Sequence, residues 1–222
     1  MTVLELKKEE EFSLTYHFFE GATFTFEEDD EVAFWTPNRG LRSEVFEAFI
    51  CRGVKRSRMR MHDCFLTGYE IPILRKQIAV CRTPPAWMPR DSILDSFKLI
   101  LKMRGLKDHA KIITEALEEV DYFNWKSRPS LDDYPEHIND NYSRALALTR
   151  LLMIPYKLWV FDNPMHGQDG DRETLLMDIL MKIHQRSGIK VFLADKPENI
   201  PSLYKRQIEI RADEEQGFKF YE

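Results

Sequence analysis

A run of four apolar residues at 158–161, ended by Asp162, narrows the fold of this chain more than any other segment. Such a run is typical of a strand buried on both faces, which occurs where helices cover both sides of a mostly parallel sheet. A helical pattern at 174–186, a stop at Gly188 and a second buried run at 190–194 continue the alternation of helix and strand. We therefore expect an α/β sheet with Asp162 at the edge where such sheets bind ligands.

The N-terminal part predicts short strands followed by a strand, a loop and a helix. Apolar and aromatic runs from Phe12 to Phe34 alternate with turns, which indicates antiparallel strands that end in the run 32–35. Residues 36–40 have turn composition, and residues 43–50 place apolar side chains on one helical face.

The middle of the chain predicts a mostly helical block over about 86–150. It follows a short strand at 78–81. The remaining predicted elements are helices at 91–104 and 108–120, a polar surface loop at 126–141, and two closing strands near 207–210 and 218–221.

Composition limits the class of protein. With 222 residues, 43% of them hydrophobic, the chain is long enough to bury a sizeable core. Its 37 acidic residues outnumber 32 basic ones, which argues against a general nucleic-acid binder. No apolar stretch predicts a signal peptide or membrane span, so we expect membrane contact only through a partner.

The cysteines predict neither a disulfide framework nor a metal site. Cys51, Cys64 and Cys81 are odd in number and lack CxxC spacing, which suits a reducing, cytoplasmic setting. His62 and Asp63 are adjacent to Cys64, and three consecutive side chains do not easily face one ion. We expect no bound metal.

The segment Ala147–Glu198 resembles the ATPase subunits of ABC transporters. It is similar, without a gap, to the family's signature helix, Walker B strand, D-loop, following helix and switch strand. Phe161-Asp162-Asn163-Pro164 resembles the Walker B end, and Gly167-Gln168-Asp169 resembles the D-loop in the form of the phospholipid-transport (Mla-type) subtype that partners mammalian-cell-entry proteins. TPNRGLRSE at 36–44 stands where the family has GPNGAGKST.

The resemblance implies an α/β fold with a P-loop (RecA-like) ABC ATPase core, N-terminal antiparallel strands and an inserted, mostly helical subdomain. It implies one domain over 1–222, with a core lobe at about 1–85 and 151–222 and the subdomain at about 86–150. An unrelated α/β domain that carries these strings by chance stays open as an alternative.

The phosphate-loop positions depart from the family pattern. Glycines let such a loop curl around phosphates with its amides pointing inward, and a Lys and a Ser/Thr complete the contacts. Here Thr36, Arg39 and Leu41 stand at glycine positions. Glu44 either repels phosphate or simply suits the first turn of a helix, and both interpretations can hold. A degenerate nucleotide site would comprise Pro37, Asn38, Gly40, Arg42, Ser43 and Asp162.

The catalytic positions are also replaced. Asn163 stands at the position of the family's catalytic glutamate, Lys196 at that of its switch histidine and Thr83 at that of its Q-loop glutamine. An amide can orient a water but cannot be its base, so we expect no active catalytic residue. Lys196 is alternatively a solvated strand-end charge. Asp162 alternatively has a structural role, bonding the phosphate loop without ATP.

The signature loop, which in the family contacts the phosphate bound on the opposite subunit, corresponds to residues 138–142. Asn139, Asp140 and Asn141 replace its central residues, and Asp140 would bring negative charge to a partner's phosphates. Asp169 matches the D-loop aspartate. We therefore expect no cofactor, with ATP and Mg²⁺ as the alternative.

These observations leave three alternative functions for the chain. The first is a non-catalytic subunit on the cytoplasmic face of the inner membrane, bound to a permease and paired with itself or with an ABC ATPase paralogue. The second is an ATP-binding subunit with slow hydrolysis, and the third is a soluble scaffold that has left the transporter. Trp87, Met88 and Phe97 are candidate permease contacts or ordinary packing residues, and the basic run 54–61 is a lipid or partner contact or a solvated surface.

Overall fold

A six-stranded sheet forms the centre of the computed structural model, which describes residues 14–18, 22–50, 59–61, 64–65, 72, 75–167, 170–213 and 217–222. The strand order is β10-β9-β3-β8-β7-β6. All neighbours in it are parallel except β10, which is antiparallel to β9. The strands are β3 (Glu31–Trp35), β6 (Ile78–Arg82), β7 (Leu158–Asp162), β8 (Ile189–Ala194), β9 (Arg206–Asp213) and β10 (Gly217–Tyr221).

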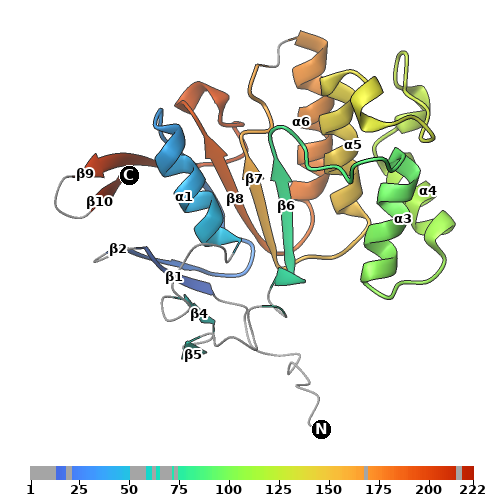
Figure 1. Ribbon diagram of the computed structural model, residues 1–222. Coiled ribbons are helices and arrows are strands. Elements are labelled where there is room, and N and C mark those ends of the chain that lie inside the picture. Colours follow the sequence, from blue (N-terminus) through green and yellow to red (C-terminus); the bar gives the residue numbers. More distant parts are fainter. Residues whose placement is uncertain are drawn as a thin grey trace, which may run out of the picture.

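Helices cover both faces of this sheet (Figure 1). On one face Phe34 and Val160 pack in a core with Phe46 of α1 (Arg39–Phe49). On the other face the alternate residues, Trp159 and Phe161 among them, pack against α5 (Asp140–Leu152) and α6 (Gly170–His184). This alternation explains the apolar run at 158–161, because successive side chains of a strand point to opposite faces.

The helical block lies on the α5 and α6 side of the sheet. Its elements are α3 (Ile93–Met103), α4 (His109–Glu119) and the short 3-10 helices η2 (Tyr122–Asn124) and η3 (Pro135–His137); a fourth short helix, η4 (Pro197–Asn199), follows β8. The predicted helices are confirmed, and Ser92 caps the first through a bond to the amide of Asp95. Phe97 is fully buried, so ordinary packing is the interpretation that holds for this residue.

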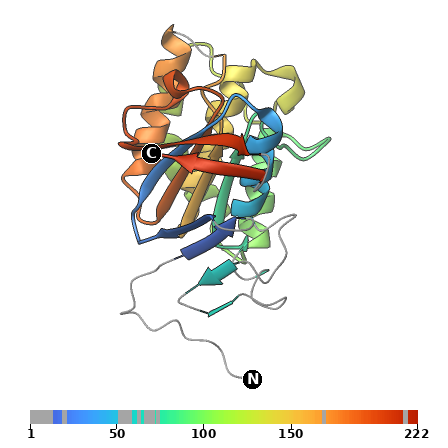
Figure 2. The same ribbon diagram turned by 90° about the vertical axis from the view of Figure 1, so that its left-hand side faces the viewer.

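A second, four-stranded sheet lies below the central one (Figures 1 and 2). It has the order β2-β1-β4-β5, formed by β1 (Leu14–Phe18), β2 (Ala22–Phe26), β4 (Met59–Met61) and β5 (Cys64–Phe65). Its paired neighbours are antiparallel, as predicted for the N-terminal strands. Including the run 32–35 in that set was wrong, because β3 pairs in parallel with β8 and β9 and its centre is buried.

Several predicted features lie outside the described residues. They are Cys51, His62, Asp63, Gln168, Asp169 and most of the basic run, residues 54–58. None of the described helices is long and apolar enough to cross a membrane.

Candidate functional site

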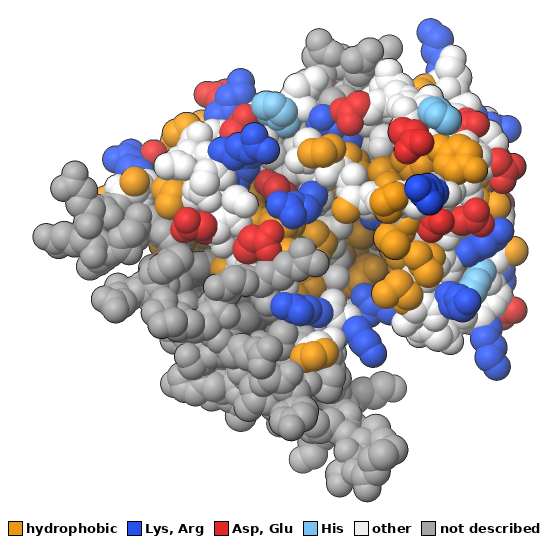
Figure 3. All heavy atoms as spheres, viewed as in Figure 1, with side chains coloured by type: hydrophobic (Ala, Val, Ile, Leu, Met, Phe, Trp, Pro, Cys, Tyr) orange, Lys and Arg blue, Asp and Glu red, His pale blue; other side chains and the backbone are white. Residues whose placement is uncertain are grey.

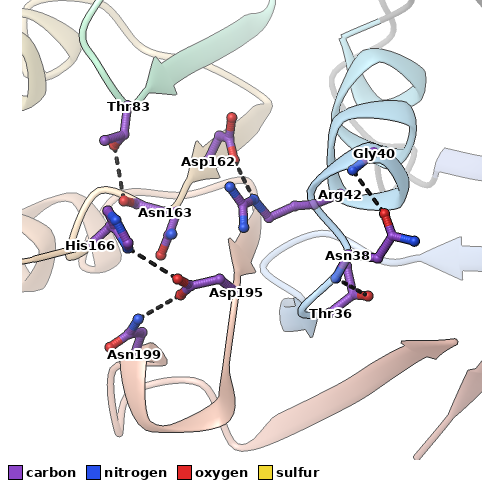
Figure 4. A network of polar contacts seen from close by, with 10 residues as sticks. All are labelled: Thr36, Asn38, Gly40, Arg42, Thr83, Asp162, Asn163, His166, Asp195 and Asn199. Carbon is purple, nitrogen blue, oxygen red and sulfur yellow. Dashed lines mark hydrogen bonds and ion pairs between the residues drawn. The ribbon is translucent and has the colours of Figure 1, made fainter.

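A cavity of about 430 Å³ lies where α1 begins and where β6, β7 and β8 end. These strands are parallel, so their carboxyl ends meet at one edge of the sheet. Figure 4 shows the polar contacts around it. The described lining residues are Pro37, Arg39, Arg42, Ser43, Arg82, Thr83, Pro84, Asp162, Asn163, His166 and Asp195.

Helix α1 begins earlier than the sequence analysis predicted. Its first residue is Arg39 rather than Ser43, so the predicted turn at 36–40 ends at Asn38, which is the N-cap. Asparagine is among the most favourable N-cap residues because its side-chain oxygen accepts bonds from the free amides of the first turn. The cap residue explains the early start.

The amides at the start of α1 are mostly bonded within the chain. A helix leaves its first four N–H groups without helical partners. Here the amides of Gly40 and Leu41 donate to Asn38 Oδ1 at 2.9 and 3.2 Å, and the amide of Asn38 donates to Thr36 Oγ1 at 3.3 Å. Of the four, only the Arg39 amide has no such bond among the described residues.

Replacing Asn38 by alanine should lower the free energy of unfolding by about 1 kcal/mol, because the two amides that it caps lose their acceptor. Urea denaturation followed by circular dichroism measures the change. Asn38→Asp is the matched control, since aspartate keeps an accepting oxygen at the N-cap. If both variants lose the same stability, the cap is not what Asn38 contributes.

An ion pair joins α1 to the end of β7. Arg42 Nε lies 3.1 Å from Asp162 Oδ1, and the two side chains are only 16% and 12% exposed. Burial raises the pKa of Asp162, while Arg42, followed by Arg82 and Arg39, opposes that rise. Asp162 thus bonds to segment 36–44 through the side chain of Arg42, whereas the N-cap of α1 is Asn38.

Asn163 and Thr83 meet beside this ion pair. Thr83 Oγ1 donates to the carbonyl of Asn163 at 2.9 Å, and the Asn163 amide donates to the Leu193 carbonyl at 2.8 Å. Asn163 has a left-handed backbone (φ 53°) and is 3% exposed. Its Oδ1 is buried without a hydrogen-bond partner among the described residues. The side chain therefore lies in the cavity wall with an accepting atom free.

The structure adds His166 and Asp195, which the sequence analysis missed. His166 Nδ1 lies 3.1 Å from Asp195 Oδ2, and Asn199 Nδ2 donates to Asp195 Oδ1 at 2.6 Å. Burial raises the pKa of Asp195, but the bonds from Asn199 and its other neighbours outweigh burial, so the pKa is below its usual range. Lys196 is exposed and is not among the described lining residues. The signal for Asp195 was available, because it directly follows a buried strand as Asp162 does.

The predicted signature-loop positions form the start of α5 and are not among the described lining residues of the cavity. Asn139 is the N-cap and accepts a bond from the amide of Asn141 at 2.9 Å. Asp140 pairs with Arg144 at 2.6 Å, which offsets the negative charge expected there. Arg144 also donates to the carbonyls of Pro164 (3.1 Å) and His166 (2.6 Å), so it joins α5 to the segment after β7.

The hydrogen bonds at this site can be compared with those that a phosphate loop makes. A phosphate loop grips phosphates with free backbone amides and a lysine. In this chain the amides of Gly40 and Leu41 are capped by Asn38, Arg42 is paired with Asp162, and a second carboxylate, Asp195, lines the cavity. No group of three or more His, Cys, Asp or Glu in the described part of the chain could hold a metal ion.

No family model matches the chain. The Fe(3+) ions import ATP-binding protein FbpC of Pasteurella multocida is 28% identical over 130 residues, 56% of this chain and 36% of that protein. FbpC 1 of Haemophilus influenzae is 27% identical over 130 residues, 56% of this chain and 38% of that protein. The cytochrome c biogenesis ATP-binding export protein CcmA of Bartonella quintana is 26% identical over 72 residues, 32% of this chain and 35% of that protein. The matches therefore span little more than a third of the curated relatives' length.

Solved structures match nearly the whole chain. An ABC transporter ATP-binding protein of Pyrococcus furiosus superposes with a TM-score of 0.66 and 18% identity, covering 90% of this chain and 97% of that one. The ATP-binding cassette MJ0796, a dimer in a post-hydrolysis state bound to ADP and phosphate, gives a TM-score of 0.67 and 16% identity, covering 89% and 93%. The chain thus has the α/β, P-loop fold of ABC ATPase domains.

Proposed function

We propose that the chain is a catalytically degenerate ABC ATPase-like subunit of a membrane transport complex, with a structural or regulatory role and little or no ATP hydrolysis. The observation that carries this proposal is the start of α1, where Arg39 and Leu41, at glycine positions of the phosphate loop, lie in the first helical turn and the amides of Gly40 and Leu41 are bonded to Asn38 Oδ1. A triphosphate would have to displace these bonds before the backbone amides could bind it.

Two further residues, Arg42 and Asn163, support the same proposal. The Arg42 guanidinium, at the position of the phosphate-loop lysine, is already paired with Asp162. Asn163, at the position of the catalytic glutamate, offers an amide, which cannot take a proton from an attacking water. Binding and hydrolysis are therefore impaired by different residues, and we expect no ATP or Mg²⁺ cofactor.

A second candidate is an ATP-binding subunit that hydrolyses slowly through Arg42, Ser43 and Asp162. One observation favours it: the His166 ring lines the same cavity and is oriented by Asp195, as a proton acceptor would need to be. In this candidate His166 takes the place of the missing glutamate.

Isothermal titration of the chain with Mg-ATP, together with a phosphate-release assay, separates the two candidates. We expect no binding up to millimolar nucleotide and no release above buffer, because the amides and Arg42 are already bonded. Micromolar binding with phosphate release that His166→Ala abolishes would instead establish the slow ATPase. The His166→Gln variant is the control, because glutamine can still form hydrogen bonds but cannot take up a proton as the imidazole ring does.

The proposed partners are a permease subunit and a second ATPase-like chain, either an identical copy or a paralogue, at the cytoplasmic face of the inner membrane. Of the predicted permease contacts, Met88 is 50% exposed, whereas the Trp87 indole donates to Ser143 Oγ at 2.8 Å and is partly buried. Met88 is therefore the residue best placed for docking. The Mla-type lipid-transport subtype rests on the GQD string alone, and Gln168 and Asp169 lie outside the described residues.

Purification of the chain from its own cells tests this assignment. Recovery of a permease together with the chain, reduced by Met88→Glu, supports a transport subunit. Recovery of the chain without any membrane protein favours the third candidate, a scaffold that has left the transporter.

A further inference from the structure

The turn between α3 and α4 presents an exposed apolar side chain among basic ones. Met103, the last residue of α3, is 73% exposed, more than any other large hydrophobic residue in the described part of the chain. Lys102 and Lys107 are exposed beside it in the sequence. Figure 3 shows Lys and Arg side chains along the lower edge of the helical block, where Figure 1 places the end of α3.

The sequence around this turn is basic although the chain as a whole is acidic. Residues 97–111 contain five basic residues and one acidic residue, whereas the formal net charge of the chain is -5. Lys102 and Lys107 form no ion pair with another described residue. Lys98 and Lys111 pair only with exposed carboxylates of their own helices, each at 3.8 Å, and such pairs are weak. The turn therefore carries positive charge that the described chain leaves largely uncompensated.

Other residues than the exposed ones hold the turn in place. Gly105 has a left-handed backbone (φ 67°), and a Cβ atom at this position would meet no atom within 4 Å. Leu106 packs against the core, and its amide donates to the carbonyl of Leu101 at 3.1 Å. The Arg104 guanidinium lies over the ring of Tyr156, 5.2 Å from the centroid. The turn is thus anchored from the inside and open on the outside.

We propose that this turn binds an anionic lipid surface directly. In this arrangement Lys102 and Lys107 contact the negative headgroups, and Met103 enters the boundary between headgroups and acyl chains. A bilayer fits this surface better than a soluble acidic partner does, because it offers an apolar layer directly beneath its negative charge. The inference goes beyond the proposed function, in which membrane contact is made through a permease, and it does not depend on the nucleotide site.

Co-sedimentation of the chain with lipid vesicles at low salt tests the proposal. We expect the chain to bind vesicles of phosphatidylcholine and phosphatidylglycerol at least about tenfold more tightly than vesicles of phosphatidylcholine alone, because each basic residue near an anionic surface contributes about fivefold. Lys102→Gln combined with Lys107→Gln should weaken binding to the anionic vesicles by about 25-fold. Met103→Gln should weaken it by at least about threefold, because the apolar contact is lost.

Helix α6 offers a matched control, since Met181 is 46% exposed and precedes Lys182 outside the basic stretch. Met181→Gln, and Lys182→Gln combined with Lys126→Gln, should bind the anionic vesicles as the unaltered chain does. Circular dichroism checks that each variant is folded. Equal binding of the unaltered chain to both kinds of vesicle, or equal losses in the control variants, overturns the proposal. Unchanged binding of Met103→Gln also overturns it, because charge alone would then explain the binding and a soluble acidic partner would fit as well.

Discussion

Replacing Arg42 by alanine should lower the free energy of unfolding by about 3 kcal/mol near pH 8, because Asp162 would stay charged and buried without a partner. The Asp162 side chain is 12% exposed, and its described ion-pair partner is Arg42 at 3.1 Å. The pair also connects α1 to the end of β7, so its loss removes a link across the candidate nucleotide site. Urea denaturation monitored by tryptophan fluorescence gives the free energy.

The loss should depend on pH, and the sign follows from the pKa of Asp162. Burial holds this pKa above its ordinary value in the folded chain even with Arg42 present, and removing Arg42 raises it further. The folded variant then binds a proton at a pH where the unfolded chain does not, so its stability increases as pH falls through the folded-state pKa. We expect the difference between variant and wild type to be smaller near pH 5 than near pH 8.

Two variants show whether the loss comes from the ion pair. Arg39→Ala removes an exposed arginine from the same helical turn and should change stability by no more than about 0.5 kcal/mol. Asp162→Asn, added to Arg42→Ala, should restore part of the loss because no buried charge remains. A loss that is equal at both pH values, or that Arg39→Ala reproduces, contradicts the argument.

Elements defined by local signals could be predicted from the sequence. The apolar run at 158–161 predicted the buried strand β7, and the spacing of apolar side chains predicted the helix α3. The strand pairing of β3 could not be predicted in this way. Its parallel partners, β8 and β9, lie far along the chain, and the turns next to β3 give no information on them. The early start of α1 was missed although Asn38 carries the signal, because the whole segment was interpreted as a turn.

The candidate site was predictable where its residues end a buried strand or begin the first helix. Arg42, Ser43, Asp162 and Asn163 line one cavity, and their roles in nucleotide binding stay predictions. Arg144 could not be found in this way, because its acceptors include backbone carbonyls. Every residue has a carbonyl, so such a contact leaves no pattern in the sequence.

Replacing Arg144 by alanine should lower the free energy of unfolding by about 3 kcal/mol, because a buried guanidinium that bonds two carbonyls would be lost. Hydrogen bonds of charged donors are each worth about 1.5 to 3 kcal/mol. Arg144 is 8% exposed, and its acceptors, the carbonyls of Pro164 and His166, belong to the segment that carries His166 into the cavity. Urea denaturation measures the loss, and amide hydrogen exchange at 163–167 should become faster.

The matched variant is Asp140→Ala, which removes the other partner of Arg144. Asp140 is 55% exposed, so its ion pair at 2.6 Å competes with water and should contribute no more than about 1 kcal/mol. If Arg144 acts through the two carbonyls, Asp140→Ala leaves hydrogen exchange at 163–167 unchanged and Arg144→Ala does not. Equal losses in the two variants would place the stabilisation in the ion pair, and α5 would then not hold the segment after β7 through Arg144.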